Sequence, residues 1–219
     1  MFESPFGDSI IERARDKGLL DIRIHDLRDY TLNKHRKVDD TPFGGGVGMV
    51  MNVEPIARAL EAIKKEAPKA KTILLSPGGS PFDQEKASEL SFQESLILIC
   101  GRYEGIDERI RLHFADEEIS IGDYILTGGE IPAMVLVEAV SRLIPGILGD
   151  SESIVEESFS DGMLEYPQYT RPRDYKGFKV PDVLVSGDPK KIRAWQKTEA
   201  LKKTESVRPD LFEKNKRSN

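Results

Sequence analysis

The stretch Leu96-Ile97-Leu98-Ile99-Cys100-Gly101-Arg102-Tyr103-Glu104-Gly105 places an apolar run directly before a glycine-rich turn. A short apolar run that ends abruptly in glycine is typical of a strand buried on both faces of a parallel sheet. Two further stretches repeat the arrangement: residues 72–75 lead into Ser76-Pro77-Gly78-Gly79, and residues 119–126 lead into Thr127-Gly128-Gly129. The sequence therefore predicts an α/β fold with a parallel sheet.

Helical periodicity fills the intervals between these strands. Apolar positions recur at helical spacing in five segments, and Leu20 to Leu27 alternates apolar with polar residues as a half-buried strand does. The predicted helices cover residues 9–17, 53–66, 83–90, 105–112 and 130–143.

Three regions follow from these patterns. Residues 1–150 are predicted to form the α/β domain, and residues 151–180, rich in Ser, Asp, Pro and Tyr, a linker. Residues 181–219 are predicted to form a small helical domain, with a short strand at 183–186 and a helix from Asp188-Pro189 to about Thr204.

Composition excludes several classes of protein. The chain has 219 residues, 38% hydrophobic and 32% charged, and no run approaches the roughly 20 apolar residues of a membrane-spanning helix. Its first residues lack the basic and apolar segments of a secretory signal, so we expect a cytoplasmic protein without a membrane anchor. One cysteine, Cys100, and three scattered histidines (His25, His35 and His113) predict neither a disulfide framework nor a structural metal.

Charge is distributed unevenly along the chain. Residues 162–219 contain 14 Lys or Arg and 8 Asp or Glu, whereas residues 1–161 contain 18 and 30. A basic C-terminal quarter favours contact with phosphates, although a helix such as 190–203 also carries cations merely to stay soluble. Charge alone leaves both interpretations open.

The glycine-rich turns are candidate ligand contacts, because ligands of open α/β sheets bind at the carboxyl ends of the strands. Familiar nucleotide signatures are missing: Gly44-Gly45-Gly46-Val47-Gly48 is not followed by Lys and Ser or Thr, and no GxGxxG follows a strand. Residues 43–51 are instead predicted to form a mobile loop that contacts a flat substrate, or simply a flexible loop.

A second candidate site combines Arg142, at the end of a predicted helix, with Glu157 in the following loop. A carboxylate can accept the ring N–H and exocyclic amine of guanine, and a cation can donate to its O6. Together the two residues complement the Watson–Crick edge of guanine.

The strings GGGVGM, LLSPGG, CGRYEGIDERI, SIGDYILTGGE, ESFSDG, YPQYTRP and PDVLVSGD, in this order, resemble the bacterial tRNA (guanine-N1)-methyltransferases that modify guanine 37, beside the anticodon. The resemblance implies a SPOUT-class α/β domain with a deep trefoil knot that binds S-adenosylmethionine. Carried over, the cofactor-binding residues are Leu75, Ser76, Pro77, Gly101, Tyr103, Glu104, Gly105, Ile121, Gly122, Asp123, Tyr124, Ile125, Leu126, Gly128, Gly129 and Pro132.

The resemblance also implies a homodimer, in which the linker and C-terminal domain of one chain complete the active site of the other. Glu157 would remove the proton from guanine N1, and Arg142 would stabilise charge on O6. The family is magnesium-dependent, but no ligand cluster is visible and no metal residue is assigned. The hypothesised tRNA phosphate contacts are Arg171, Arg173, Lys190, Lys191 and Arg193.

Two departures from the family pattern stand out. The family usually has Asp as its proposed base, at the position where this chain has Glu157. The sequence therefore supports the action of a carboxylate more strongly than the choice of one particular carboxylate. By comparison with the family, about eleven N-terminal residues that would form a first strand are absent. Each buried apolar side chain of such a strand is worth roughly 1.5 to 3 kcal/mol, so a miscalled start codon or an artificially shortened sequence is the preferred explanation. A ribose methyltransferase of the same class and a non-catalytic RNA-binding relative are the alternative functions.

Overall fold

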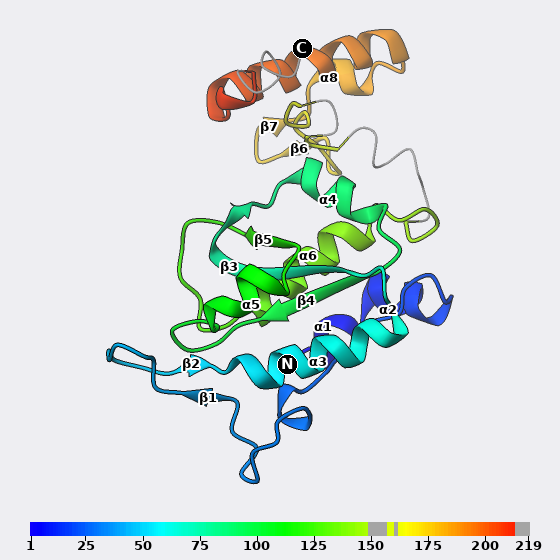
Figure 1. The fold of residues 1–219 in the computed structure, drawn as a ribbon. Coiled ribbons are helices and arrows are strands. Elements are labelled where there is room, and N and C mark those ends of the chain that lie inside the picture. Colours follow the sequence, from blue (N-terminus) through cyan, green and yellow to red (C-terminus); the bar gives the residue numbers. More distant parts are fainter. Residues whose placement is uncertain (149–156, 160–161, 213–219) are drawn as a thin grey trace. The chain divides into compact units, whose positions relative to one another are not determined.

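The computed structural model describes residues 1–148, 157–159 and 162–212 and divides into two units, Met1–Gly149 and Asp150–Asn219. A parallel sheet forms the centre of the first unit (Figure 1). Its middle strand is β3 (Lys71–Pro81), flanked by β4 (Leu96–Cys100) and β5 (Glu117–Ser120). The predicted parallel sheet is thus confirmed.

Helices cover both faces of this sheet. On one face α3 (Val53–Glu66) and α5 (Glu108–His113) pack against Leu74, and on the other α4 (Gln84–Ser91) and α6 (Glu130–Ser141) pack against Ile73. Figure 1 shows α3 below the sheet and α4 and α6 above it. Because successive strand side chains point to opposite faces, a strand with apolar residues at every position needs a helical layer on each side.

Local sequence explains where α4 and α5 begin. The carboxylate of Asp83 accepts the backbone N–H of Lys86 at 3.0 Å before α4, and that of Asp107 accepts the N–H of Arg109 at 3.0 Å before α5. Such caps satisfy backbone donors that lack a partner within the helix. The predicted helices at 53–66, 83–90, 105–112 and 130–143 are confirmed within a few residues.

The N-terminal part of the first unit contains only short elements: α1 (Glu3–Phe6), α2 (Ser9–Asp16), the 3-10 helix η1 (Leu27–Asp29), β1 (Asp39–Asp40) and β2 (Val50–Met51). The helix predicted at 9–17 is confirmed as α2. The strand predicted at 20–27 is wrong, because residues 20–26 pair with no strand in the described part of the chain. Alternating polarity creates a strand only where a neighbour accepts its backbone hydrogen bonds, and Ile24 is 58% exposed.

The third strand of the sheet is shorter than predicted. β5 ends at Ser120 rather than continuing to Leu126. The hydroxyl of Ser120 accepts the N–H of Gly122 at 3.2 Å, and this local bond turns the backbone out of the sheet.

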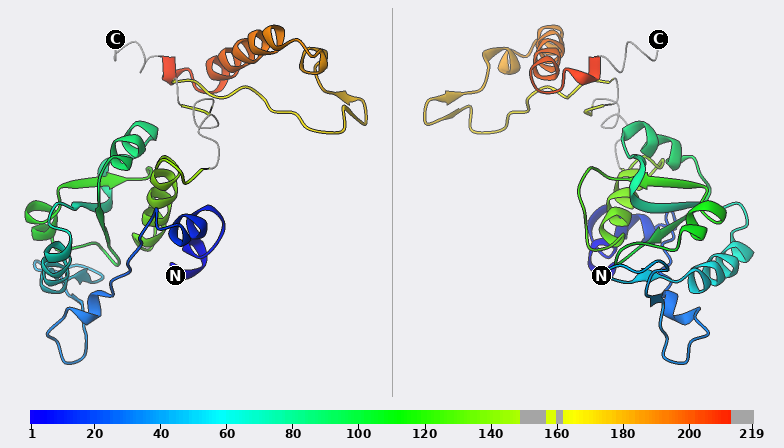
Figure 2. Two further views of the ribbon diagram at one scale, coloured as in Figure 1. Left: turned by 90° about the vertical axis from the view of Figure 1, so that its right-hand side faces the viewer. Right: turned by 60° about the vertical axis from the view of Figure 1, so that its left-hand side comes forward.

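The second unit contains the hairpin β6 (Asp174–Tyr175) and β7 (Phe178–Lys179), the 3-10 helix η2 (Asp182–Val185) and α8 (Pro189–Val207). Figure 2 shows the hairpin beyond the N-terminal end of α8. The helix predicted from 188 to 204 is confirmed, whereas the strand predicted at 183–186 is a 3-10 helix. No helix in the described ranges is long and apolar enough to cross a membrane.

Candidate active site

The ends of β4 and β5 lie beside the same point of β3. Leu75 of β3 is in register with Cys100 of β4 and with Ile119 of β5. The three glycine-rich turns therefore leave the same edge of the sheet, which we call the glycine edge and define as residues 76–79, 101–105 and 121–129. The geometry is that of a ligand site in an open α/β sheet.

The first turn differs from the prediction, because it lies within β3 rather than after it. Both Leu75 and Ser80 pair with Ile119, so residues 76–79 bulge out between them. Gly79 is required there, since a Cβ on it would lie 2.6 Å from the carbonyl carbon of Ile119. The close approach of two backbones explains the glycine without any ligand.

The second and third turns contact each other directly. The N–H of Gly129 donates to the carbonyl oxygen of Gly101 at 2.7 Å, and Arg102 bridges to Gly128. Nε of Arg102 donates to Glu130 Oε1 at 2.6 Å. These contacts fix the start of α6 against the end of β4.

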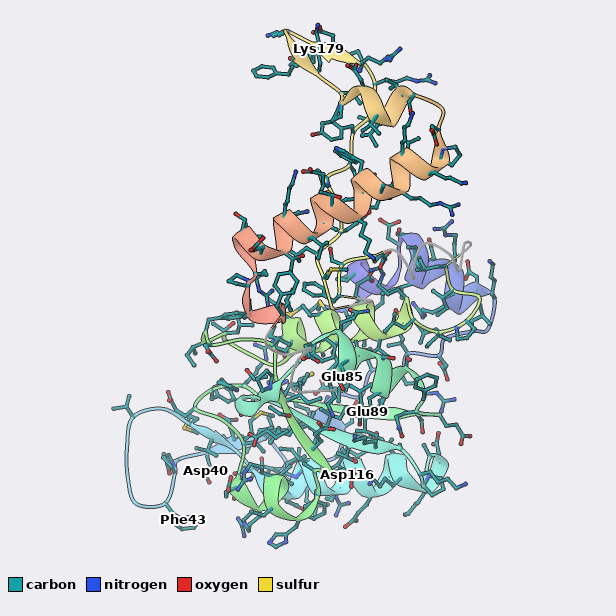
Figure 3. The ribbon with its side chains drawn as sticks, turned by 90° about the horizontal axis from the view of Figure 1, so that it is seen from above. Asp40, Phe43, Glu85, Glu89, Asp116 and Lys179 are labelled. Atoms are coloured by element: carbon teal, nitrogen blue, oxygen red, sulfur yellow. The ribbon has the colours of Figure 1, made fainter. Side chains whose placement is uncertain are left out.

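Residues 43–51 run beside the second turn. The N–H of Glu104 donates to the carbonyl oxygen of Met49, and the N–H of Met51 to that of Gly105, each at 3.0 Å. Phe43, at the outer end of the loop, is fully exposed (Figure 3). The loop predicted to contact a flat substrate thus begins exposed and ends hydrogen-bonded to the glycine edge.

The predicted cofactor residues have two features that a flat ligand could use. Tyr103, Tyr124, Ile125 and Leu126 expose apolar surface on the turns, with Ile125 81% exposed. A Cβ on Gly105 would meet no atom within 4 Å, so space is open beside that backbone. Exposed apolar side chains beside open backbone suit a flat ring that also needs polar partners.

Cys100 lies at the same edge of the sheet, but its thiol is unreactive. Burial, followed by the negative charge of Glu130, raises the pKa of its thiol to about 12, against a smaller opposing effect of Arg102. The thiol is therefore protonated at neutral pH and is no nucleophile.

Arg142 is placed away from the glycine edge of its own chain. It caps the C-terminal end of α6, and Gly129 caps the N-terminal end. With a rise of 1.5 Å per residue, the two caps are separated by about 20 Å. Within one chain, Arg142 is therefore separated by the length of α6 from Gly129, the last residue of the glycine edge.

Glu157 belongs to the second unit and is partly buried. It opens a turn in which the N–H of Phe159 donates to the carbonyl oxygen of Met163 at 2.7 Å. Its neighbour Glu156 lies outside the described residues.

The hypothesised phosphate contacts are exposed in the second unit. Arg171 and Arg173 precede the hairpin, and Lys190, Lys191 and Arg193 occupy the first turns of α8. The carboxylate of Asp188 caps this helix by accepting the N–H of Lys190 at 3.1 Å.

Sequence reasoning missed the hairpin itself. Tyr175 and Phe178 are paired across it and exposed, and Lys176 Nζ lies 5.4 Å from the centre of the Tyr175 ring. Lys176 and Gly177 both have positive φ, as the two-residue turns that join hairpin strands require. The dipeptide Lys-Gly between aromatic residues was the available signal.

No group of three or more His, Cys, Asp or Glu side chains gathers in a metal-binding arrangement within residues 1–148, 157–159 and 162–212. No residue is assigned to a magnesium ion.

Comparison with known proteins covers nearly the whole chain. A family model described as tRNA (Guanine-1)-methyltransferase TrmD matches residues 1–214. The chain is 60% identical to a tRNA (guanine-N(1)-)-methyltransferase of Dictyoglomus turgidum over 214 residues, 98% of this chain and 86% of that protein. Proteins of the same name from Citrifermentans bemidjiense and Heliobacterium modesticaldum are 54% and 56% identical, covering 97% of this chain and 86% and 80% of their own lengths.

Proposed function

The chain belongs to the tRNA (guanine-1)-methyltransferase family, and we propose that its glycine edge binds the methyl donor while Glu157 and Arg142 act on the guanine. The enzyme methylates N1 of guanine in tRNA and uses a methyl donor of the S-adenosylmethionine type. The observation that supports the proposed site is the meeting of the three glycine-rich turns at one edge, with Gly129 bonded to Gly101.

When bound, S-adenosylmethionine supplies an electrophilic methyl group on a sulfonium. Guanine N1 carries a proton and becomes nucleophilic only after this proton is removed. The Glu157 carboxylate accepts this proton, a role worth about 10²- to 10⁴-fold in rate. The Arg142 guanidinium donates to O6, where negative charge develops as the proton leaves.

The target is guanine 37, which must leave its stack to reach the glycine edge. The exposed cations Arg171, Arg173, Lys190, Lys191 and Arg193 hold the phosphates of the tRNA. The second unit, with α8 as its main element, acts as a small helical tRNA-binding domain that follows a linker. The first domain is a knotted domain of the SPOUT class, a proposal that rests on the family to which the chain belongs.

A homodimer completes the site. Because the glycine edge and Arg142 lie at opposite ends of α6, about 20 Å apart, a second copy has to bring its own Arg142 to the edge. Glu157 reaches the edge in the same way, from the partner's linker.

Mixed dimers test this arrangement. Glu157→Gln removes the base, and Ile125→Asp removes exposed apolar surface from the glycine edge; each variant alone is expected to lose most turnover. Co-expressed and purified through two different tags, the pair regains one intact site per dimer, up to half of wild-type activity, if the two chains share each site. Absence of recovery would place both residues in one chain's site, and wild-type turnover of Glu157→Gln would remove its role as base.

Mass spectrometry of the digested tRNA locates the methyl group on N1 of guanine 37 or elsewhere.

A further inference from the structure

The turn that carries Glu157 closes on itself through backbone hydrogen bonds. The N–H of Phe159 donates to the carbonyl oxygen of Met163 at 2.7 Å, and the N–H of Gly162 to that of Phe159 at 3.2 Å. The N–H of Glu165 donates to the hydroxyl of Ser158 at 3.0 Å. Glu157 directly precedes Ser158, the first residue in these bonds, so the orientation of the bonded turn sets the direction in which the backbone of Glu157 leaves it.

Helix α8 holds this turn at three points. The N–H of Leu164 donates to the hydroxyl of Thr204 at 2.9 Å, and Lys203 Nζ donates to the carbonyl oxygen of Glu165 at 3.1 Å. The guanidinium of Arg208, the residue that caps the C-terminal end of α8, lies 5.9 Å from the centre of the Phe159 ring. In Figure 2 the chain after the turn runs back along α8 toward the hairpin.

Thr204 is the buried member of these three anchors. Its side chain is 0% exposed, and its hydroxyl donates to the carbonyl oxygen of Ala200 at 2.8 Å. With the proton committed to Ala200, the oxygen lone pairs are left to accept the N–H of Leu164. A buried hydroxyl that both donates and accepts a hydrogen bond fixes the distance between the helix and the turn more tightly than an exposed contact does.

We propose that Thr204 is a positioning residue for the methyl transfer, which it serves by holding the Glu157 turn on α8. The inference rests on the proposed role of Glu157 as the base. Thr204 touches neither substrate nor methyl donor in this role. It sets where the carboxylate stands, and proton transfer depends steeply on that position because a general base works only within hydrogen-bond reach.

Thr204→Val and Thr204→Ser test the proposal. Valine keeps the shape and loses the hydroxyl, whereas serine keeps the hydroxyl. Thr204→Val is expected to lower kcat by about 10- to 100-fold, since a displacement near 1 Å has an effect of that size, with the Kd for tRNA and the KM for S-adenosylmethionine unchanged. Thr204→Ser is expected to restore most of kcat.

The matched control is Thr198→Val. Thr198 lies on the same helix and donates to the carbonyl oxygen of Ala194 at 2.9 Å, as Thr204 does to Ala200, but it is exposed. Its substitution is expected to leave kcat at the wild-type value. Equal losses in Thr198→Val and Thr204→Val would show a general effect on α8 and overturn the proposal, as would a wild-type kcat in Thr204→Val.

A double-mutant cycle separates this inference from the proposed function. In the Glu157→Gln background, Thr204→Val is expected to change the single-turnover rate by less than about twofold, because residues that act through one group are not additive. A full further loss would mean that Thr204 acts through something else. If Glu157→Gln alone keeps wild-type turnover, the base assignment fails, and positioning of Glu157 by Thr204 fails with it. If Glu157→Gln is inactive but Thr204→Val is normal, only the present inference fails.

Lys203→Met keeps the test decisive if Thr204→Val does not fold. Lys203 is exposed, so its substitution removes a second anchor without altering the interior. A lower kcat at unchanged Tm supports positioning by α8, and an unchanged kcat overturns it.

Discussion

The N–H of Gly129 donates a 2.7 Å hydrogen bond to the carbonyl oxygen of Gly101, although the two residues lie in different turns. A Cβ on Gly129 would lie 2.7 Å from Cα of Cys100, so the backbones touch with no room for a side chain. One glycine thus joins the end of β4 to the start of α6.

Gly129→Ala is expected to lower the Tm and to weaken binding of S-adenosylhomocysteine more than tenfold, because the backbone of Cys100 has to move away. Gly78→Ala is the control for stability: its Cβ would meet nothing closer than 3.6 Å, and its φ is not positive, so its Tm should stay near the wild-type value. Thermal unfolding compares the two variants, and calorimetric titration measures the affinity of Gly129→Ala against wild type. A wild-type Tm in Gly129→Ala would contradict the close packing of the two turns.

Cys100 is expected to resist alkylation in the folded protein. Burial and the charge of Glu130 raise the pKa of its thiol to about 12, so reaction with iodoacetamide at pH 8 should be at least about 100-fold slower than in urea, where the thiol has its ordinary pKa. Mass spectrometry of timed samples follows the reaction. Equal rates in buffer and urea would mean that the thiol is not held protonated.

Glu117 is expected to stabilise the first unit in a pH-dependent manner. Partial burial acts to raise its pKa, but hydrogen bonds from Lys71 and Lys86 outweigh burial and lower the pKa below the usual 4.5. The Nζ atoms lie 2.7 and 2.8 Å from its carboxylate, and Glu89 of α4 (Figure 3) pairs with the same lysines. The stabilisation is therefore full above pH 4.5 and is lost as pH falls through the lower folded pKa.

Glu117→Gln should accordingly lower the free energy of unfolding by about 1 kcal/mol at pH 7. The difference from wild type should vanish in acid, where both side chains are neutral. Urea unfolding at pH 7 and at acid pH measures it, and a difference that persisted in acid would contradict the electrostatic cause.

Thr72→Val is expected to raise the free energy of unfolding by about 1 kcal/mol. The Thr72 hydroxyl is buried in the sheet and has no hydrogen-bond partner among the described residues. Valine has the same shape and suits a strand. Urea unfolding compares the two proteins, and a lower stability would indicate that the hydroxyl has a partner after all.

Removal of single charges from the second unit is expected to weaken tRNA binding and flatten its salt dependence. Arg173→Gln or Lys190→Gln should each reduce the slope of log Kd against log salt by about 1. Lys65→Gln, an exposed site on α3 in the acidic first unit, is the control. Unchanged slopes in the first two variants would remove these residues from the phosphate contacts.

The sequence alone located the three strands of the parallel sheet and the four helices that cover it. The run from Leu96 to Cys100 has no polar position, so it had to be buried on both faces, and the helices of both layers follow from the 3.6-residue spacing of their apolar residues. The same local rules failed at residues 20–27, where apolar and polar residues alternate, and at residues 183–186, which are mostly apolar. Neither segment has a neighbouring strand to pair with in the described part of the chain.

Only the tertiary structure decided what lies next to what. The continuation of β3 beyond its glycines, the bond from Gly129 to Gly101, and the hold of Thr204 on the Glu157 turn all join residues distant in sequence. Such contacts depend on how whole elements pack, and no local pattern encodes that arrangement. The separation of Arg142 from the glycine edge has the same origin, because the length of one rigid helix, rather than any motif, sets it.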